Sequence, residues 1–333
     1  METKLDLIDK RILAELDKNC RIPNSILGKK IRRSRETVKY RIQQLQARGI
    51  ITGFITSINP NKLGYYMFKV YLKLENIPEE REKFFEELKQ NKDIYWLGIS
   101  AGAFDCVFAI LCKSITEYFL KINSLLSKWR HLIISKVLGL MVDTRQYNKK
   151  FFTNEEGQYV IFGGDVIDNK IDDLDYKILS TLANDARIPI VRLARKVNST
   201  PEVVRARIKK LEEKGVILNY RIAVDFNKLG LEFHKVFIYF RTLSKKDLEA
   251  LFEWTRVHPN AVYHITSIAP WDAELEFVVN NYQQLNSVID DLRKEFPHVI
   301  RNYEHLIITY ETWMPAYKEF LKTSPQNPLT RTG

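Results

Sequence analysis

The amino-acid sequence predicts an α+β protein built as a tandem duplication. Each half is expected to hold a helix-turn-helix domain followed by a ferredoxin-like domain. A long segment recurs at a constant offset of 166 residues, each copy contains three stretches of helical periodicity, and a β-α-β-β-α-β pattern follows each copy. Hydrophobic residues make up 45% of the chain and charged residues 28%, which is typical of globular proteins with real cores.

The repeat is clearest in the first part of each half. Residues 5–64 and 171–230 are identical at 21 of 60 positions, and the alignment needs no gap. The tripeptide Arg21-Ile22-Pro23, for example, recurs as Arg187-Ile188-Pro189. A period this long indicates duplicated domains, because the repeats of solenoid proteins span only about 20–50 residues.

Three helices are expected in each copy of this segment. In the first copy, helical spacing of apolar residues predicts helices over about 5–16, 24–31 and 35–48. The tripeptide Arg21-Ile22-Pro23 breaks the pattern between the first two helices. This order of a helix, a turn and a further helix is typical of the helix-turn-helix motif, in which the helix after the turn enters the major groove.

The ends of the third helix carry clear signals. Ser34 is placed to cap the free N–H groups of the first turn, and Gly49 is placed to end the helix. In the second copy Thr200 takes the capping position. Pro201 follows at the first helical position, where its missing N–H group costs no hydrogen bond.

One face of the third helix is suited to reading DNA. Val38, Ile42 and Leu45 share a face that should pack on the first two helices. The opposite face is polar, and Gln, Lys and Arg side chains bind base edges and phosphates. The candidate DNA contacts on both copies are Ser34, Arg35, Glu36, Thr37, Lys39, Tyr40, Arg41, Gln43, Gln44, Thr200, Glu202, Arg205, Arg207, Lys209 and Lys210.

The charge balance favours the same interpretation. The chain has a formal net charge of +11, and residues 28–48 hold eight Lys or Arg side chains against one acid, Glu36. A local excess of this kind is expected for a surface that binds duplex DNA. The alternative is that these charges form only a solvated helix face.

The two third helices differ on their polar faces. Ala206 replaces Tyr40, and Lys209-Lys210 replaces Gln43-Gln44. We therefore expect the two helices to read different half-sites, so that the operator lacks strict two-fold symmetry.

The predicted domain boundaries follow from these patterns. The residues between the two halves are rich in Gly, Asn and Asp and indicate a linker, in which Tyr159–Phe162 could form a short strand. The expected parts are a helix-turn-helix domain over 1–60, a ferredoxin-like domain over 61–147, a linker over 148–170, a second helix-turn-helix domain over 171–226, a second ferredoxin-like domain over 227–321 and a flexible tail over 322–333.

Sequence signals for a catalytic centre are lacking. The chain has no Gly-rich phosphate loop with its lysine and no Gly-x-Ser-x-Gly motif, so we expect no catalytic residues, no cofactor and no metal site. Three cysteines without a Cys-x-x-Cys spacing predict buried free thiols in a reducing compartment. With a charged N-terminus and no apolar run of about 18 residues, a cytoplasmic, nucleoid-associated location is expected.

These motifs resemble those of a known family. The patterns are L-x-x-I-D-K-R-I-L-x-x-L from Leu5, R-I-P from Arg21, R-I-x-x-L-x-x-x-G-I-I from Arg41 and N-K-L-G from Asn61. Together they resemble the leucine-responsive regulatory protein/AsnC (Lrp/AsnC) family of bacterial and archaeal transcription factors. The resemblance covers nearly the whole chain, twice. It implies sequence-specific binding to double-stranded DNA and ferredoxin-like domains of the RAM type, which pair into dimers and higher assemblies.

The resemblance also implies a small-molecule effector such as an amino acid. The family's Gly-x-x-Asp turn maps onto Gly102-Ala103-Phe104-Asp105, and Ala269-Pro270-Trp271-Asp272 keeps only the Asp. Gly102, Asp105 and Asp272 are thus the candidate effector residues. The alternative is that each Asp only bonds backbone near its turn. Because both RAM-type domains lie in one chain, they could pair within it as a pseudo-dimer, and chains could dimerise further.

Two other functions stay open. The siroheme decarboxylases share this pair of domains and use His and Arg residues in the RAM half, so His264 is the residue here that fits an enzyme. The first copy, however, has Gly98 at the equivalent position. The second alternative is a non-specific architectural DNA-binding protein.

Overall fold

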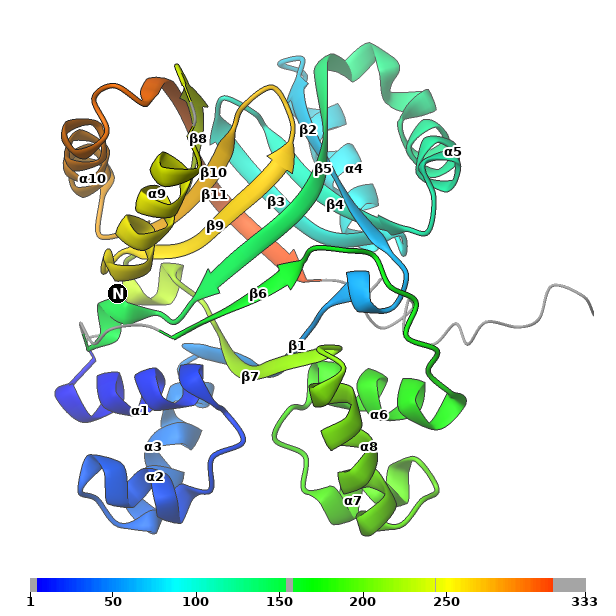
Figure 1. Ribbon diagram of the computed structural model, residues 1–333, viewed down its shortest axis with the longest axis vertical. Coiled ribbons are helices and arrows are strands. Elements are labelled where there is room, and N and C mark those ends of the chain that lie inside the picture. The colour runs from blue at the N-terminus through cyan, green and yellow to red at the C-terminus, as the bar shows by residue number, and fades with distance from the viewer. Residues whose placement is uncertain (1–4, 154–157, 243, 314–333) are drawn as a thin grey trace, which may run out of the picture.

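The helix-turn-helix units occupy one end of the molecule, and a β-barrel flanked by helices occupies the other (Figure 1). The computed structural model describes residues 5–153, 158–242 and 244–313. Within them the predicted tandem duplication of a helix-turn-helix domain and a ferredoxin-like domain is confirmed.

The first half contains the predicted helices and strands in the predicted order, together with one strand, β1, that was not predicted. They are α1 (Leu7–Lys18), α2 (Asn24–Ile31), α3 (Arg35–Ala47), β1 (Ile51–Ile58), β2 (Tyr66–Leu74), α4 (Pro78–Gln90), β3 (Ile94–Gly102), β4 (Cys106–Cys112), α5 (Ile115–Leu126) and β5 (Ile133–Tyr147). A further strand, β6 (Tyr159–Gly163), precedes the second half.

The second half repeats this order. Its elements are α6 (Asp173–Asn184), α7 (Ile190–Lys196), α8 (Pro201–Glu213), β7 (Ile217–Val224), β8 (Glu232–Phe240), α9 (Lys245–Val257), β9 (Ala261–Ile268), β10 (Ala273–Val279), α10 (Tyr282–Glu295) and β11 (Ile300–Trp313). Short 3-10 turns lie at Pro60–Lys62, Ser127–Leu132, Lys150–Phe152 and Asn227–Leu229.

The signals at the start of the third helix are confirmed. The Ser34 hydroxyl accepts the backbone N–H of Thr37 at 3.1 Å, and the Thr200 hydroxyl accepts that of Val203 at 3.4 Å. Gly49 has a φ of +71°, a conformation that costs glycine less than other residues. The apolar face of α3 is buried as predicted.

A two-stranded ribbon joins the two helix-turn-helix units. β1 and β7 pair antiparallel, with Phe54 opposite Ile222. Each first helix packs on the ribbon strand of the other copy, α1 on β7 and α6 on β1. The apolar residues of both units therefore form one continuous core.

The repeated Arg-Ile-Pro turns form a second contact between the units. Arg21 Nη1 donates to the Ala186 carbonyl at 2.5 Å, and Arg187 Nη2 donates to Asn24 Oδ1 at 2.8 Å. Each guanidinium carbon also lies 5.2 Å from a ring centroid of the ribbon, Arg21 over Tyr220 and Arg187 over Phe54. The motif that revealed the duplication thus holds the two copies together.

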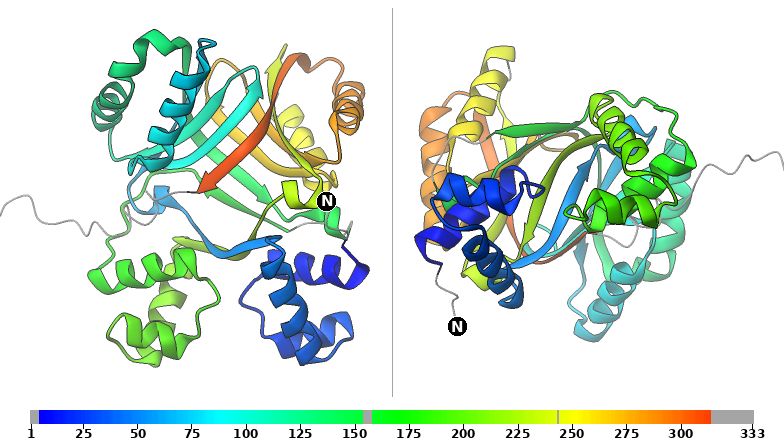
Figure 2. Two further views of the ribbon diagram at one scale, coloured as in Figure 1. Left: turned by 180° about the vertical axis from the view of Figure 1, so that it is seen from behind. Right: turned by 90° about the horizontal axis from the view of Figure 1, so that it is seen from below.

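The strands of both ferredoxin-like domains form one sheet. Its order is β2-β4-β3-β11-β8-β10-β9-β5-β6, and an additional pairing of β2 with β5 closes eight of these strands into a barrel. The two longest strands belong to both halves: β5 pairs with β2 and with β9, and β11 pairs with β8 and with β3. The predicted pairing of the two domains within one chain is therefore present, and α4, α5, α9 and α10 flank the barrel (Figure 2).

The segment predicted as a linker is part of the fold. The short strand is confirmed, because β6 pairs with β5 along its length. Phe152 and Lys150 are buried, and the Asn61 amide donates to the Gly164 carbonyl at 2.8 Å. The described parts of this segment, residues 148–153 and 158–170, are therefore anchored to both layers, which the Gly- and Asn-rich composition did not reveal. The predicted tail over 322–333 lies outside the described residues.

A buried ion cluster ties the ribbon to the barrel. Asp17 of α1 accepts hydrogen bonds from Arg221 Nη2 at 2.8 Å and from Lys149 Nζ at 2.7 Å. Burial raises the pKa of Asp17, but the charges of Arg221 and Lys149 outweigh burial and lower it to about 2. The charged form of Asp17 therefore stabilises the folded state.

We predict that Asp17→Asn removes a pH-dependent part of the stability. Because folding lowers the Asp17 pKa from 3.8 to about 2, its contribution is present above pH 5 and is lost as pH falls towards 2. The loss amounts to about 2 kcal/mol. Urea unfolding between pH 5 and pH 2 measures this. The free energy of unfolding of the variant should fall by about 2 kcal/mol less than that of the parent. Glu213→Gln, at an exposed position, should keep the parental profile, and equal losses in Asp17→Asn and the parent would contradict the assignment.

Candidate nucleic-acid interface

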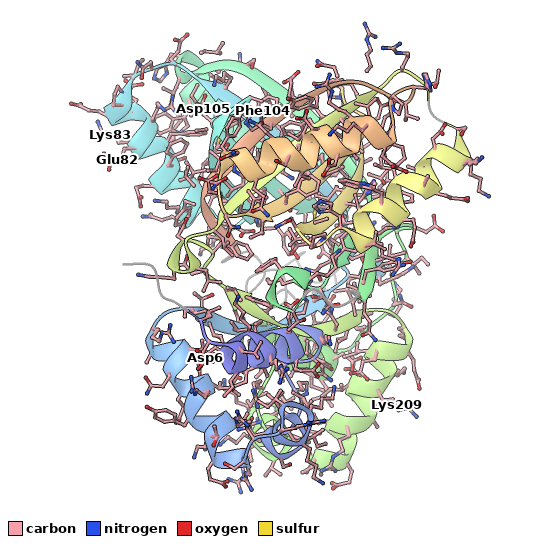
Figure 3. All side chains as sticks on the ribbon, turned by 90° about the vertical axis from the view of Figure 1, so that its left-hand side faces the viewer. Asp6, Glu82, Lys83, Phe104, Asp105 and Lys209 are labelled. Atoms are coloured by element: carbon pink, nitrogen blue, oxygen red, sulfur yellow. The ribbon has the colours of Figure 1, made fainter. Side chains whose placement is uncertain are left out.

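The polar faces of α3 and α8 are open to solvent. On α3 the side chains of Arg35, Lys39 and Tyr40 are exposed, with Tyr40 59% exposed. On α8 the side chains of Arg205 and Lys209 are exposed, and Figure 3 shows Lys209 at the edge of the molecule. Gln43, Gln44, Glu36, Glu202 and Lys210 are exposed as well, and Thr37 is half-buried.

The two helix-turn-helix units lie side by side, at the end of the molecule away from the barrel (Figure 1 and Figure 2). The shared core and the arginine contacts described above link the two units directly. The separation of α3 and α8 is consequently set by packed contacts inside one chain.

Two candidate DNA contacts are directed elsewhere. Arg41 Nη1 lies 2.7 Å from Asp6 and 3.3 Å from Asp9, at the start of α1. Arg207 repeats this arrangement with Asp172 at 2.5 Å. The hydrogen bond from Asp6 raises the pKa of Arg41. Both arginines therefore tie the third helix to the first, because their position on the helix faces the neighbouring N-terminus.

The outer charges of α8 make only weak internal pairs. Arg205 lies 3.5 Å from Glu202, and Lys209 lies 3.7 Å from Glu213. All four side chains are more than half exposed. Such ion pairs contribute at most about 1 kcal/mol, so a phosphate group can displace the carboxylate at small cost.

The candidate effector residues have structural roles at strand ends of the barrel. Asp105 Oδ2 accepts the backbone N–H of Leu74 at 2.8 Å, and Asp272 Oδ2 accepts that of Phe240 at 2.7 Å. Each Asp thus bonds the end of the first strand of its domain, not its own turn. Gly102 has a φ of +122°, and a Cβ there would lie 2.7 Å from the His305 carbonyl oxygen, so the close approach of β11 requires glycine.

The histidine that fits an enzyme is buried. His264 is 0% exposed, its ring centroid lies 4.3 Å from that of the tilted Phe252 ring, and its Nδ1 lies 3.1 Å from the Thr255 hydroxyl. Burial lowers the His264 pKa to about 3. The three cysteines are free and buried, as predicted. Among the described helices none has the length and apolar character needed to cross a bilayer.

Comparison with known proteins identifies the family. An AsnC-type helix-turn-helix domain matches residues 5–46, and a winged helix-turn-helix DNA-binding domain matches residues 171–217. The HTH-type transcriptional regulator LrpB of Bacillus subtilis is 31% identical over 125 residues, which are 38% of this chain and 83% of LrpB. The chain belongs to the Lrp/AsnC family. It is a helix-turn-helix transcriptional regulator of this type with two such units in one chain.

Other relatives agree with this assignment. The HTH-type transcriptional regulator Ptr1 of Methanocaldococcus jannaschii is 36% identical over 111 residues, which are 33% of this chain and 74% of Ptr1. Over the whole chain, the fold is similar to the siroheme decarboxylase NirDL, with a TM-score of 0.61 and 12% identity over 95% of this chain and 97% of that one. The likeness to NirDL shows a shared architecture only. Family membership implies double-stranded DNA as a partner and association of the repeated units.

We predict that Asp105→Ala lowers the free energy of unfolding by about 1–3 kcal/mol, because the Leu74 N–H group loses its partner. Asp105→Asn keeps an oxygen acceptor for this group and should lose less. Urea unfolding of both variants measures the difference. If Asp105→Ala were as stable as the parent, the bond to Leu74 would not be the reason for Asp at this turn.

Proposed function

We propose that a single chain binds an operator without two-fold symmetry, with α3 and α8 in successive major grooves. The main support is that the polar faces of α3 and α8, which differ in sequence, are held side by side by contacts inside one chain. In regulators made of identical chains, a two-fold axis presents the same helix twice and matches a palindromic site. Here α3 and α8 differ, so we expect each helix to bind a different half-site.

The base-reading residues are proposed from the exposed face alone. Tyr40, Gln43 and Gln44 on α3 offer stacking and amide groups. The equivalent positions of α8 hold Ala206, Lys209 and Lys210, which offer only cations for recognition. An amide side chain recognises adenine, and Lys recognises guanine or phosphate. Arg35, Lys39 and Arg205 supply phosphate contacts. Arg41 and Arg207 are assigned to positioning the third helix, because carboxylates of the first helix already bind them.

The barrel supports a single chain as the DNA-binding unit. Pairing of the two RAM-like domains is complete within one chain, because β5 and β11 each bridge both domains. A second chain is therefore not needed to present two recognition helices, and we propose the single chain as the DNA-binding unit. Association of chains and a small effector such as an amino acid would add regulation, but Asp105 and Asp272 are proposed as structural residues.

We propose binding, not catalysis, as the activity. His264 is the residue that suggested a decarboxylase, and it is enclosed by Phe252 and Thr255 with its pKa lowered by burial. A neutral, enclosed imidazole is poorly placed to contact a large tetrapyrrole. Absorbance of the protein mixed with siroheme tests this: a shift in the Soret region would support the enzyme instead.

Lys39→Glu is expected to weaken binding to duplex DNA by at least about tenfold at low salt, because it replaces a phosphate contact with a repelling charge. The slope of log K against log salt should fall by about one unit, since one counterion fewer is released. Fluorescence anisotropy with a labelled duplex measures both. Lys246→Glu on α9 changes charge equally and should leave affinity unchanged. Equal affinities of the parent and Lys39→Glu would remove α3 from the interface.

Recoding α8 with first-copy residues should change the symmetry of the preferred site. The recoded variant carries Val203→Thr, Ala206→Tyr, Lys209→Gln and Lys210→Gln, all at exposed positions. Selection from a random duplex pool should give an asymmetric site for the parent and an inverted repeat for the recoded variant. A perfect inverted repeat for the parent would contradict unlike half-sites, and no enrichment at all would indicate an architectural protein.

A further inference from the structure

Four charged side chains meet inside the barrel, where the two RAM-like domains join. Lys69 lies on β2 and Lys235 on β8, while Glu274 and Glu276 both lie on β10. Lys69 Nζ and Lys235 Nζ donate to the same oxygen of Glu274, at 2.9 Å and 2.8 Å, and Lys235 also donates to Glu276. None of the four residues is more than 5% exposed. The first half thus contributes one cation, and the second half contributes the rest.

The two copies contribute different charges to this cluster. The two lysines occupy equivalent positions: Lys69 lies opposite Ala109 on the neighbouring strand, and Lys235 lies opposite Glu276. The residue equivalent to Glu274 in the first copy is Val107, which lies opposite Tyr71 of β2. The residue equivalent to Glu276 is Ala109. Both copies therefore place a lysine in the barrel, but only the second copy supplies carboxylates.

The net charge at these four positions then depends on which domains pair. A first domain with a second domain brings two lysines and two glutamates, which balance. Two first domains would bring two lysines with no carboxylate at these positions. Two second domains would bring two lysines against four glutamates. An unbalanced buried charge is strongly unfavourable, so only the mixed pair is free of this penalty.

The burial of Lys69 indicates that it needs a carboxylate partner. Burial lowers the pKa of Lys69 to about 8, although Glu274 acts to raise it. Without Glu274, burial would act on Lys69 unopposed by its principal partner. Glu274 also accepts hydrogen bonds from Tyr71 at 2.5 Å and from Ser267 at 3.1 Å. One carboxylate thus satisfies groups from both halves of the chain.

We propose that this cluster makes closure of the barrel selective, so that a first RAM-like domain accepts only a second RAM-like domain as its partner surface. The contacts themselves need not add net stability, because well-packed apolar residues can replace a buried ion pair without loss. Their effect is to penalise the two like pairings. As a result α3 is always presented beside α8, never beside another α3. This inference concerns assembly and does not depend on DNA binding.

The first test recreates the interior of a first–first pair within the intact chain. The double variant Glu274→Val with Glu276→Ala installs first-copy residues and leaves two lysines unpaired. We expect its thermal midpoint to fall by more than about 10 °C, as expected for an uncompensated buried charge. Adding Lys69→Met and Lys235→Met should recover most of the loss.

The outcomes of this test separate charge from packing. If the double variant does not fold while the quadruple variant does, unpaired lysines are the cause and the proposal is supported. A double variant as stable as the parent would overturn it. So would a quadruple variant as unstable as the double variant, because the loss would then come from missing side-chain volume.

The second test measures pairing directly. A protease site inserted after the exposed residue Asp165 allows the folded protein to be cut into its two halves. The cut protein is unfolded in urea and refolded, and native mass spectrometry counts the pairs. For the parent, mixed pairs should exceed first–first pairs by more than about 100-fold. The quadruple variant should form both kinds. First–first pairs in comparable amount in the parent would overturn the proposal.

Discussion

The molecule depends on two strands that are each shared by both halves of the chain. β5 completes the first RAM-like domain and then continues onto β9 of the second, while β11 completes the second and continues onto β3 of the first. Backbone hydrogen bonds along these strands leave the two domains no independent position. Sheet closure therefore determines where the ends of the barrel lie, and with them the starting points of both helix-turn-helix units.

The DNA-binding end is coupled to this barrel at defined points. Asp17 of α1 binds Arg221 of the ribbon and Lys149 just after β5, so one carboxylate joins helix, ribbon and barrel. The ribbon in turn supports α1 on one side and α6 on the other. Motion of one recognition helix relative to the other would have to disturb this buried network, which is costly because removing one partner leaves a buried charge unpaired.

Much of the fold could be predicted from sequence because local signals agreed with each other. The caps at Ser34 and Thr200, the apolar face of α3 and the order of helices and strands along each RAM-like domain all follow from short-range patterns, whereas the β1–β7 ribbon and the strand order within the sheet do not. The direction of Arg41 could not be predicted, because it depends on where α1 begins in space. Lys69 and Glu274 in apolar strands were a visible anomaly, but only the closed barrel shows that they meet.

The linker segment also shows that local composition does not reveal long-range contacts. Gly, Asn and Asp residues indicate irregular backbone, yet the amide of Asn61 and strand β6 fix this segment on the barrel. Its local composition describes its conformation correctly and says nothing of its partners. Long-range contacts of this kind, like those of the Arg-Ile-Pro turns, become visible only in three dimensions.

The joining of both units in a single polypeptide also has a consequence for evolution. In a regulator assembled from two identical chains, one mutation in the recognition helix appears on both sides of the complex at once, and the target site must change at two places. Here α3 and α8 are encoded separately and are held together by Arg21 and Arg187. A mutation in one helix can therefore drift or be selected on its own, with half of the old recognition kept intact.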